Sequence, residues 1–223
     1  MQYKTIMHGK FLSRPNRFIA LVEMNGKEQI CHVKNTGRCR ELLIPGTHVI
    51  LSAAKNPARK TAFDLVAVKK GDRLINIDAQ APNQATAEFL PTVFPKGAIC
   101  PEYKIEDSRL DFCIETRDGP VYLEVKGVTL EEDGVAMFPD APTLRGTKHL
   151  RTLTRLAMQE YKTYVLFVIQ MECVSYFTPN RRTDPIFADA LVEAAAAGVT
   201  LWARDCHITD NTMEIGSAVE IRL

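Results

Sequence analysis

Two acids and a lysine occur at a spacing that could place them together on neighbouring strands. Asp111 lies in the run Ser-Arg-Leu-Asp-Phe, and Glu124, thirteen residues after Asp111, lies with Lys126 in the run Tyr-Leu-Glu-Val-Lys-Gly. Side chains alternate between the faces of a strand, so Glu124 and Lys126 share one face. Carboxylates that are brought together repel unless a cation lies between them, and oxygen ligands suit Mg²⁺ or Mn²⁺. The pattern predicts a metal site with Asp111 and Glu124 as ligands and Lys126 as the residue that orients a water or neutralises developing charge.

Other residues could complete this predicted site, and each has an alternative. Glu102, on the preceding extended run, is a candidate third metal ligand, or else a solvent-facing edge residue. Glu88 could support the metal through a hydrogen-bonded ligand, although a surface position is the favoured interpretation. His149 is a candidate general base, but a structural hydrogen-bonding role is the favoured interpretation. A chance Glu-Val-Lys strand is the alternative for the whole pattern. Both acids, however, lie within hydrophobic runs, where an unpaired charge is costly.

The elements that must position these residues form a predicted α/β domain over residues 81–223. Apolar periodicity and turn residues indicate a helix, three extended runs, a helix, a strand, a helix and a strand, which together describe a mixed sheet. The helices are expected at Pro82–Leu90, closed by Pro91, at Thr143–Tyr161 and at Pro185–Ala197, with Gly198 as its C-cap; the extended runs are Glu102–Glu106, Arg109–Glu115, Val121–Val128, Tyr164–Met171 and Val199–Ala203.

Residues 1–80 show a different pattern, with short β-type runs and turn signals about every ten residues. Asn25-Gly26 between two such runs is the strongest hairpin signal, because both residues tolerate the positive φ of a type I′ turn. A small closed β-barrel of the oligonucleotide-binding kind is the predicted fold. The expected strands are Phe18–Met24, Glu28–Val33, His48–Ala54 and Phe63–Lys69, and a helical turn is expected at Arg38–Leu43.

Charge is distributed unevenly between the two parts. Of the 28 basic and 27 acidic residues, 14 and 6 lie before residue 81, a net charge of +8, which leaves 14 and 21, a net charge of −7, for the rest. A basic surplus of this size favours a polyanionic partner through counterion release, and a solvated surface without a partner is the alternative. The candidate nucleic-acid contacts in the first part are Arg14, Arg17, Asn35, Thr36, Arg38 and Arg40, with Phe11 and Phe18 beside them either as stacking residues or as core.

The helix expected from Thr143 onward offers a second phosphate contact. Thr143 can cap this helix, and Arg145 and Lys148 follow in its first turns, where the helix dipole already favours an anion. Arg145 and Lys148 are therefore candidate contacts to a scissile strand beside the acidic pocket.

Composition excludes several classes of protein. No run approaches 18 consecutive apolar residues, so a membrane span is not expected, and the first residues lack the pattern of a secretory signal. The six cysteines show no Cys-x-x-Cys pair, which argues against a zinc module or a disulfide framework. We expect a cytoplasmic protein with reduced cysteines.

The quoted motifs resemble those of the sugar fermentation stimulation protein A (SfsA) family. The resemblance covers the whole chain and is carried by the runs containing Asp111 and Glu124, by Arg17-Phe18, by Asn35-Thr36-Gly37-Arg38 and, most specifically, by Phe138–Leu150. Two departures are visible. Lys34 stands where a proline often precedes Asn-Thr-Gly, and Gly127 stands where a small polar residue usually follows the lysine.

The resemblance implies an N-terminal barrel similar to an OB-fold and a C-terminal domain similar to PD-(D/E)XK nucleases. In such a domain Asp111 and Glu124 would bind metal and Lys126 would serve catalysis. The resemblance also implies DNA binding linked to sugar metabolism genes. We therefore expect a DNA-binding protein with a Mg²⁺- or Mn²⁺-dependent phosphodiesterase site. The alternative is a non-catalytic DNA-binding regulator that keeps the nuclease fold, and a third possibility is an enzyme acting on a small acidic ligand.

Overall fold

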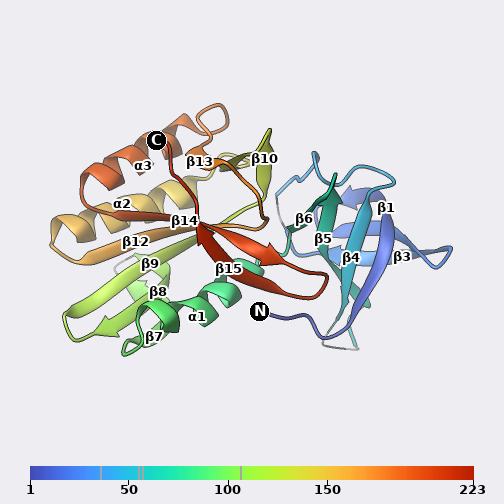
Figure 1. Cartoon of the computed structure of the whole chain (residues 1–223), viewed down its shortest axis with the longest axis horizontal. Coiled ribbons are helices and arrows are strands. Elements are labelled where there is room, and N and C mark those ends of the chain that lie inside the picture. Colours follow the sequence, from blue (N-terminus) through green and yellow to red (C-terminus); the bar gives the residue numbers. More distant parts are fainter. Residues whose placement is uncertain (36, 55, 57, 106) are drawn as a thin grey trace.

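Two β-rich parts lie side by side in the molecule (Figure 1). The computed structural model describes residues 1–35, 37–54, 56, 58–105 and 107–223, so that Thr36 and Glu106 lie outside the described residues. The first part contains strands β1–β6, and the second contains all three helices and strands β7–β15. This arrangement confirms the predicted barrel followed by a mixed sheet flanked by helices.

The first part is a closed five-stranded barrel. Its strands run in the order β3-β2-β1-β4-β5, and a parallel pairing of β3 with β5 closes the sheet. Asn25 and Gly26 have φ angles of 50° and 72°, as the predicted hairpin between β2 and β3 requires. The strands of the barrel and the short strand that follows are β1 (Ile6–Asn16), β2 (Ile19–Met24), β3 (Lys27–Val33), β4 (His48–Ala53), β5 (Phe63–Lys70) and β6 (Arg73–Asn76).

Alternation along the strands fills the barrel. In β2 the side chains of Ala20, Val22 and Met24 are buried, whereas their neighbours in the sequence are more exposed. Phe11 of β1 also lies in this core, which leaves it unable to stack on a base. The helical turn expected at Arg38–Leu43 is present as a single turn in which the Cys39 carbonyl accepts from the N–H groups of Leu42 and Leu43.

The second part is built on a six-stranded sheet of order β15-β14-β12-β9-β8-β7. Strands β9, β12 and β14 are parallel, and the outer strands pair antiparallel. A small three-stranded sheet, β10-β11-β13, was not expected from the sequence. The strands are β7 (Ala98–Ile105), β8 (Ser108–Thr116), β9 (Gly119–Val128), β10 (Leu130–Glu132), β11 (Val135–Phe138), β12 (Lys162–Ile169), β13 (Tyr176–Pro179), β14 (Thr200–Ile208) and β15 (Met213–Ala218).

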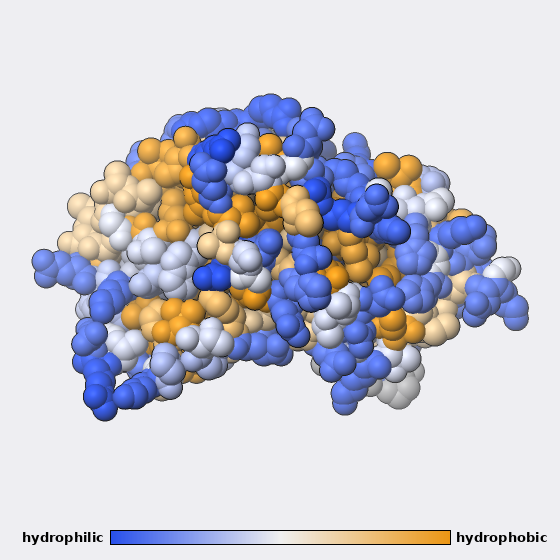
Figure 2. Space-filling view, viewed as in Figure 1, coloured by the Kyte–Doolittle hydropathy of each residue, from blue (hydrophilic) through white to orange (hydrophobic). Residues whose placement is uncertain are grey.

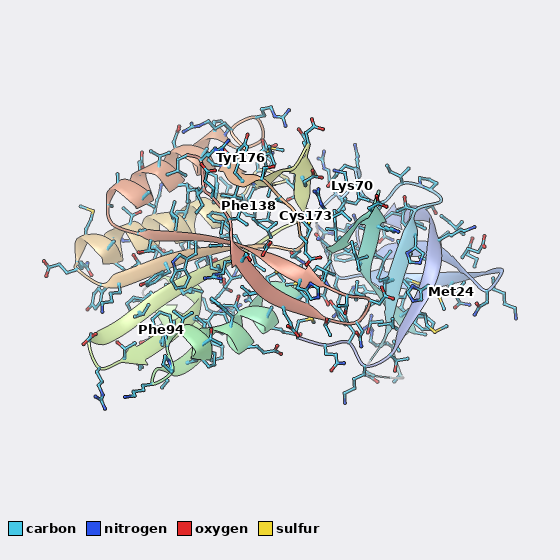
Figure 3. All side chains as sticks on the ribbon, in the orientation of Figure 1. Met24, Lys70, Phe94, Phe138, Cys173 and Tyr176 are labelled. Carbon is cyan, nitrogen blue, oxygen red and sulfur yellow. The ribbon has the colours of Figure 1, made fainter. Side chains whose placement is uncertain are left out.

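Helices cover both faces of this sheet. Helix α1 (Ala81–Val93) packs on one face, and α2 (Leu144–Met158) and α3 (Pro185–Ala196) pack together on the other. Phe138 fills the second interface, with its ring centroid 6.0 Å from that of Phe167 and 5.1 Å from that of Phe187 (Figure 3). Among the described residues no helix combines the length and the apolar character needed to cross a bilayer.

The helix ends follow the sequence signals with one exception. Thr143 caps α2 by accepting from the N–H of Gly146, and Gly198 follows α3 with a φ of 98°. The prediction that Pro91 closes α1 is wrong, because the helix continues to Val93 and the N–H of Phe94 donates to Leu90. Pro91 removes only the hydrogen bond to the carbonyl of Ala87, four residues earlier, and the helix ends two residues after it.

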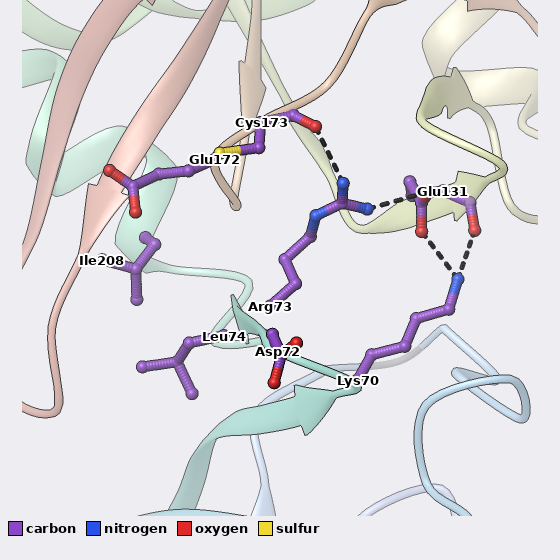
Figure 4. Close-up of a pocket in the computed structure, with 8 residues that line it drawn as sticks. All are labelled: Lys70, Asp72, Arg73, Leu74, Glu131, Glu172, Cys173 and Ile208. Carbon is purple, nitrogen blue, oxygen red and sulfur yellow. Dashed lines mark hydrogen bonds and ion pairs between the residues drawn. The ribbon is translucent and has the colours of Figure 1, made fainter.

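An ion-pair network joins the two parts. Glu131 of β10 is 5% exposed and accepts from Lys70 and Arg73, which flank the turn between β5 and β6 (Figure 4). The first residues of the chain also cross the junction, because Gln2 pairs with Thr212 and the N–H of Tyr3 donates to Asn211. Residues 1–5 thus extend from the barrel onto the second part, although the sequence suggested a boundary only at residue 80.

Figure 2 shows hydrophilic residues along most of the outline of this face, with apolar patches between them.

Candidate metal centre and nucleic-acid interface

Asp111 and Glu124 come together where the ladder between β8 and β9 ends. The last regular pair is Phe112 with Leu123, so Asp111 follows opposite Glu124 in the antiparallel register. Beyond that pair a side chain replaces the backbone carbonyl as acceptor, because Oδ2 of Asp111 accepts from the N–H of Val125 at 2.8 Å. The two predicted ligands therefore lie just beyond the last regularly paired residues of β8 and β9.

Glu124 is the most buried member of the cluster, with 2% exposure. Its Oε1 accepts from Lys126 Nζ at 2.6 Å and makes a second hydrogen bond with Nδ1 of His149, on α2. Its Oε2 is buried and has no hydrogen-bond partner in the described structure. A buried, unpartnered carboxylate oxygen is costly, and a bound cation would remove the cost.

The electrostatics of the two acids differ. Burial, reinforced by the charge of Glu124, raises the pKa of Asp111. Burial would also raise the pKa of Glu124, but the Lys126 ammonium and the hydrogen bond with His149 hold that pKa below its usual range. Two acids whose environments shift their pKa values apart are typical of functional sites.

Two helical residues hydrogen-bond the acids. Asn83, in the first turn of α1, donates to Asp111 Oδ1 at 2.8 Å, and no sequence signal singled it out. His149, for which a structural hydrogen-bonding role was favoured, makes its hydrogen bond with Glu124. Asn83 and His149 reach the two acids from helices on opposite faces of the sheet.

The structure does not bring Glu102 or Glu88 into the cluster. Glu102 has a φ of 54°, and its carboxylate pairs with Arg109 Nε at 2.9 Å in an exposed ion pair. This position agrees with the alternative interpretation of Glu102 as a solvent-facing edge residue. Glu88 is exposed and pairs with the amino group of Met1 at 2.6 Å. Within the part of the chain that the structure describes, no three His, Cys, Asp or Glu side chains are arranged to hold a metal ion.

The remaining donor set fits a hard divalent cation that keeps part of its water shell. Mg²⁺ is commonly held by only one or two carboxylates and several waters. Asp111 and Glu124 would supply these carboxylates, and the free Oε2 of Glu124 is the oxygen available for this bond. Lys126 lies beside them as a nearly buried cation that could neutralise negative charge.

In the barrel, Arg14 has a structural role in place of the predicted nucleic-acid contact. Its guanidinium donates to four backbone carbonyls, at 2.7 or 2.8 Å, so little of it is left for a phosphate. Three of these carbonyls, those of Asn35, Gly37 and Arg38, belong to one loop. Asn35 adds to this order by accepting from the N–H of Gly37 and donating to Ile77. Thr36 lies outside the described residues.

The other predicted arginines of the barrel are exposed. Arg17, Arg38 and Arg40 surround a hollow of 280 Å³ beside the loop that Arg14 holds. The guanidinium of Arg17 also lies 4.7 Å from the ring centroid of the partly exposed Phe18. The hollow thus offers exposed cations, and an accessible aromatic ring lies against one of them, a combination that suits binding of a nucleic-acid strand.

The predicted phosphate contacts on α2 differ in availability. Arg145 is exposed, whereas Lys148 donates to the Asp107 carbonyl at 2.8 Å and pairs with the Asp107 carboxylate at 3.0 Å.

The segment before α2 lies close to the barrel loop, because a Cβ added to Gly37 would lie 2.4 Å from Oδ2 of Asp140. Glycine at position 37 is what allows this close approach between the two parts.

Comparison with known proteins finds a matching family model for each of the two parts. A family model described as "SfsA N-terminal OB domain" matches residues 12–77, and one described as "Sugar fermentation stimulation protein RE domain" matches residues 80–212. The chain belongs to the SfsA family. Sugar fermentation stimulation protein homologues of Desulfitobacterium hafniense (strain Y51) and Ruminiclostridium cellulolyticum are 52% and 49% identical to it, over 100% of this chain and 99% and 100% of theirs.

A solved SfsA structure has the same fold. It is described as "The structure of Pyrococcus Furiosus SfsA in complex with Ca2+", and the comparison gives a TM-score of 0.89 at 28% identity over 100% of this chain and 98% of that one.

The structure of this chain gives a reason for one departure from the SfsA motifs, the glycine at position 127. A Cβ at Gly127 would lie 2.6 Å from Oε1 of Gln170 and 2.8 Å from Cγ of Pro82. In this SfsA protein, α1 packs too closely on β9 for a side chain at that position.

Proposed function

We propose that this SfsA protein is a divalent-metal-dependent nuclease that binds DNA through its barrel. The observation that carries the proposal is the buried Oε2 of Glu124, which has no partner among the described residues although it lies in a cluster with Asp111 and Lys126. A structural role for Glu124 would be expected to satisfy both of its oxygens.

Asp111 and Glu124 would hold Mg²⁺ or Mn²⁺, and the bound ion would act as a Lewis acid on the scissile phosphate and lower the pKa of a water. The Pyrococcus furiosus relative is described in complex with Ca²⁺, another cation that takes oxygen ligands. Asn83 orients Asp111, and His149 orients Glu124. Lys126 would neutralise charge on the phosphoryl oxygens or orient the attacking water.

DNA would be held mainly through its phosphates. Arg17, Arg38 and Arg40 supply exposed cations in the barrel, and Arg145 supplies one at the start of α2. No recognition helix of the helix-turn-helix kind is among these contacts, so affinity is expected to fall steeply with salt.

Glu124→Gln tests the proposal because it keeps the shape of the side chain and removes its charge. With Mn²⁺ or Mg²⁺ we expect the native protein to cleave DNA and the variant to lose at least about 100-fold of that rate, the order of loss typical of a key electrostatic group. Calorimetric titration with Mn²⁺ should show binding to the native protein alone. Glu102→Gln, which removes a carboxylate from a surface ion pair, should leave both results unchanged. Equal cleavage by native protein and Glu124→Gln would refute the nuclease.

A non-catalytic DNA-binding regulator of sugar metabolism genes is the second candidate. It is favoured by the ion pair and hydrogen bond that Lys126 and His149 already give to Glu124, and by the lack of a third metal-ligating side chain in the described structure. Salt-sensitive DNA binding without metal binding and without cleavage would support it.

A further inference from the structure

A cavity of 460 Å³ lies between the barrel and the first turn of α1, apart from the candidate metal ligands. Its volume falls within the range of about 300–1,000 Å³ that is usual for sites of small molecules. The barrel contributes Lys34, Arg59 and Asp64 to its walls, and the start of α1 contributes Gln80 and Gln84.

The walls of this cavity carry fixed charge and free amides. Lys34 pairs with the buried Asp78 at 2.8 Å, and Arg59 pairs with the buried Asp64 at 2.8 Å. With Lys4, the lining holds three cationic side chains against two carboxylates, an excess of one positive charge. The side-chain amides of Gln80 and Gln84 are exposed and have no hydrogen-bond partner within the described part of the chain.

Two chains of contacts link the walls of the cavity to residues of the candidate metal centre. Gln84 follows Asn83, whose amide donates to Asp111 at 2.8 Å. On the other side, the Asp78 carbonyl accepts from Gln170 at 3.2 Å, and Gln170 Oε1 packs against Gly127, the residue after Lys126.

The cavity and the basic hollow are lined by residues of one chain segment. Lys34 lines the cavity, while Gly37 and Arg38, a few residues later, line the hollow with Arg17 and Arg40. A strand whose phosphates follow the arginines could therefore turn a single base toward the amides.

We propose that this cavity is a subsite for one unpaired nucleotide, and that the protein prefers single-stranded DNA or an unpaired DNA end. The inference rests on the proposed function and names its substrate class. The cavity is too small for a base pair with its two backbones. Gln80 and Gln84 would hydrogen-bond the edge of the base, which is accessible only when that base is unpaired.

Binding without metal tests the subsite separately from cleavage. The full chain, in buffer with EDTA, is titrated against a short fluorescein-labelled oligodeoxynucleotide, either single-stranded or annealed to its complement, and anisotropy is recorded. We expect several-fold tighter binding of the single strand. The double variant Gln80→Ala and Gln84→Ala should weaken single-strand binding by about five- to tenfold, the loss of one or two hydrogen bonds, and leave duplex binding unchanged. Gln159→Ala, an exposed glutamine beyond α2, is the matched control and should change neither affinity.

Three results would overturn the subsite. These are duplex preference in the native protein, an unchanged single-strand affinity in the double variant, and equal weakening of both DNA forms. A deoxynucleoside monophosphate is added as competitor; displacement at the affinity of the strand itself would instead assign the cavity to a free nucleotide. Failure of the proposed nuclease activity would appear only in the metal-binding and cleavage measurements on Glu124→Gln. It is therefore distinguishable from failure of the proposed subsite, which appears in the binding measurements without metal.

Discussion

At the scale of single residues, Arg14 shows that a basic side chain in a basic surface can be structural. Its planar guanidinium satisfies carbonyls of Arg17, Asn35, Gly37 and Arg38, a set that a lysine ammonium cannot match in number or direction. The exposed arginines of the hollow depend on the loop that Arg14 holds. Arg14 therefore acts on a nucleic acid only through the positions of its neighbours.

Arg14→Lys is expected to lower the free energy of unfolding by about 1–3 kcal/mol, because several backbone carbonyls lose a charged donor. Chemical denaturation of native and variant protein measures the change. Arg40→Lys, a matched substitution at an exposed arginine of the same hollow, should stay within about 0.5 kcal/mol. Equal stability of the two variants would show that Arg14 does not organise the loop.

At the scale of elements, the candidate site depends on how closely α1 lies on β9. Gly127 is in β9, directly after Lys126, and Pro82 of α1 packs on it from the same turn that presents Asn83 to Asp111. A side chain at position 127 would separate the helix from the strand and so move Asn83 from Asp111.

Gly127→Ala is expected to destabilise the protein by about 1–3 kcal/mol, because the added Cβ would overlap Gln170 and Pro82. Thermal and denaturant unfolding measure the loss. Arg117→Ala, at an exposed position in the turn between β8 and β9, should have an effect within about 0.5 kcal/mol. A variant as stable as the native protein would mean that α1 can shift without cost.

At the scale of the whole molecule, Glu131 couples the barrel to the second part. Burial by itself would raise its pKa, but Lys70, the N–H of Gly134 and Arg73 together lower the pKa of Glu131 to about 2. A folded-state pKa below the usual value near 4.5 means that this carboxylate stabilises the fold above about pH 4.5 and loses that contribution between about pH 4.5 and 2.

The free energy of unfolding is therefore expected to fall more steeply below about pH 4.5 in the native protein than in Glu131→Gln. The variant should be less stable near neutral pH, since its amide leaves Lys70 and Arg73 without their carboxylate. Denaturant unfolding at several pH values gives both curves. Parallel curves would remove Glu131 as the source of the acid sensitivity.

Local rules account for the individual elements and for the neighbouring positions of Glu124 and Lys126. The Asn25-Gly26 hairpin, the Thr143 cap and the apolar β12 follow from rules that act within a few residues, and alternation in β9 placed Glu124 beside Lys126. Which other residues join Glu124 and Lys126 depends on the packing of distant segments. Asn83 and His149 reach the acids from separate helices, Glu102 turns to Arg109, and Arg14 turns to its own loop. These contacts depend on packing between segments distant in the chain, and no local pattern encodes that packing.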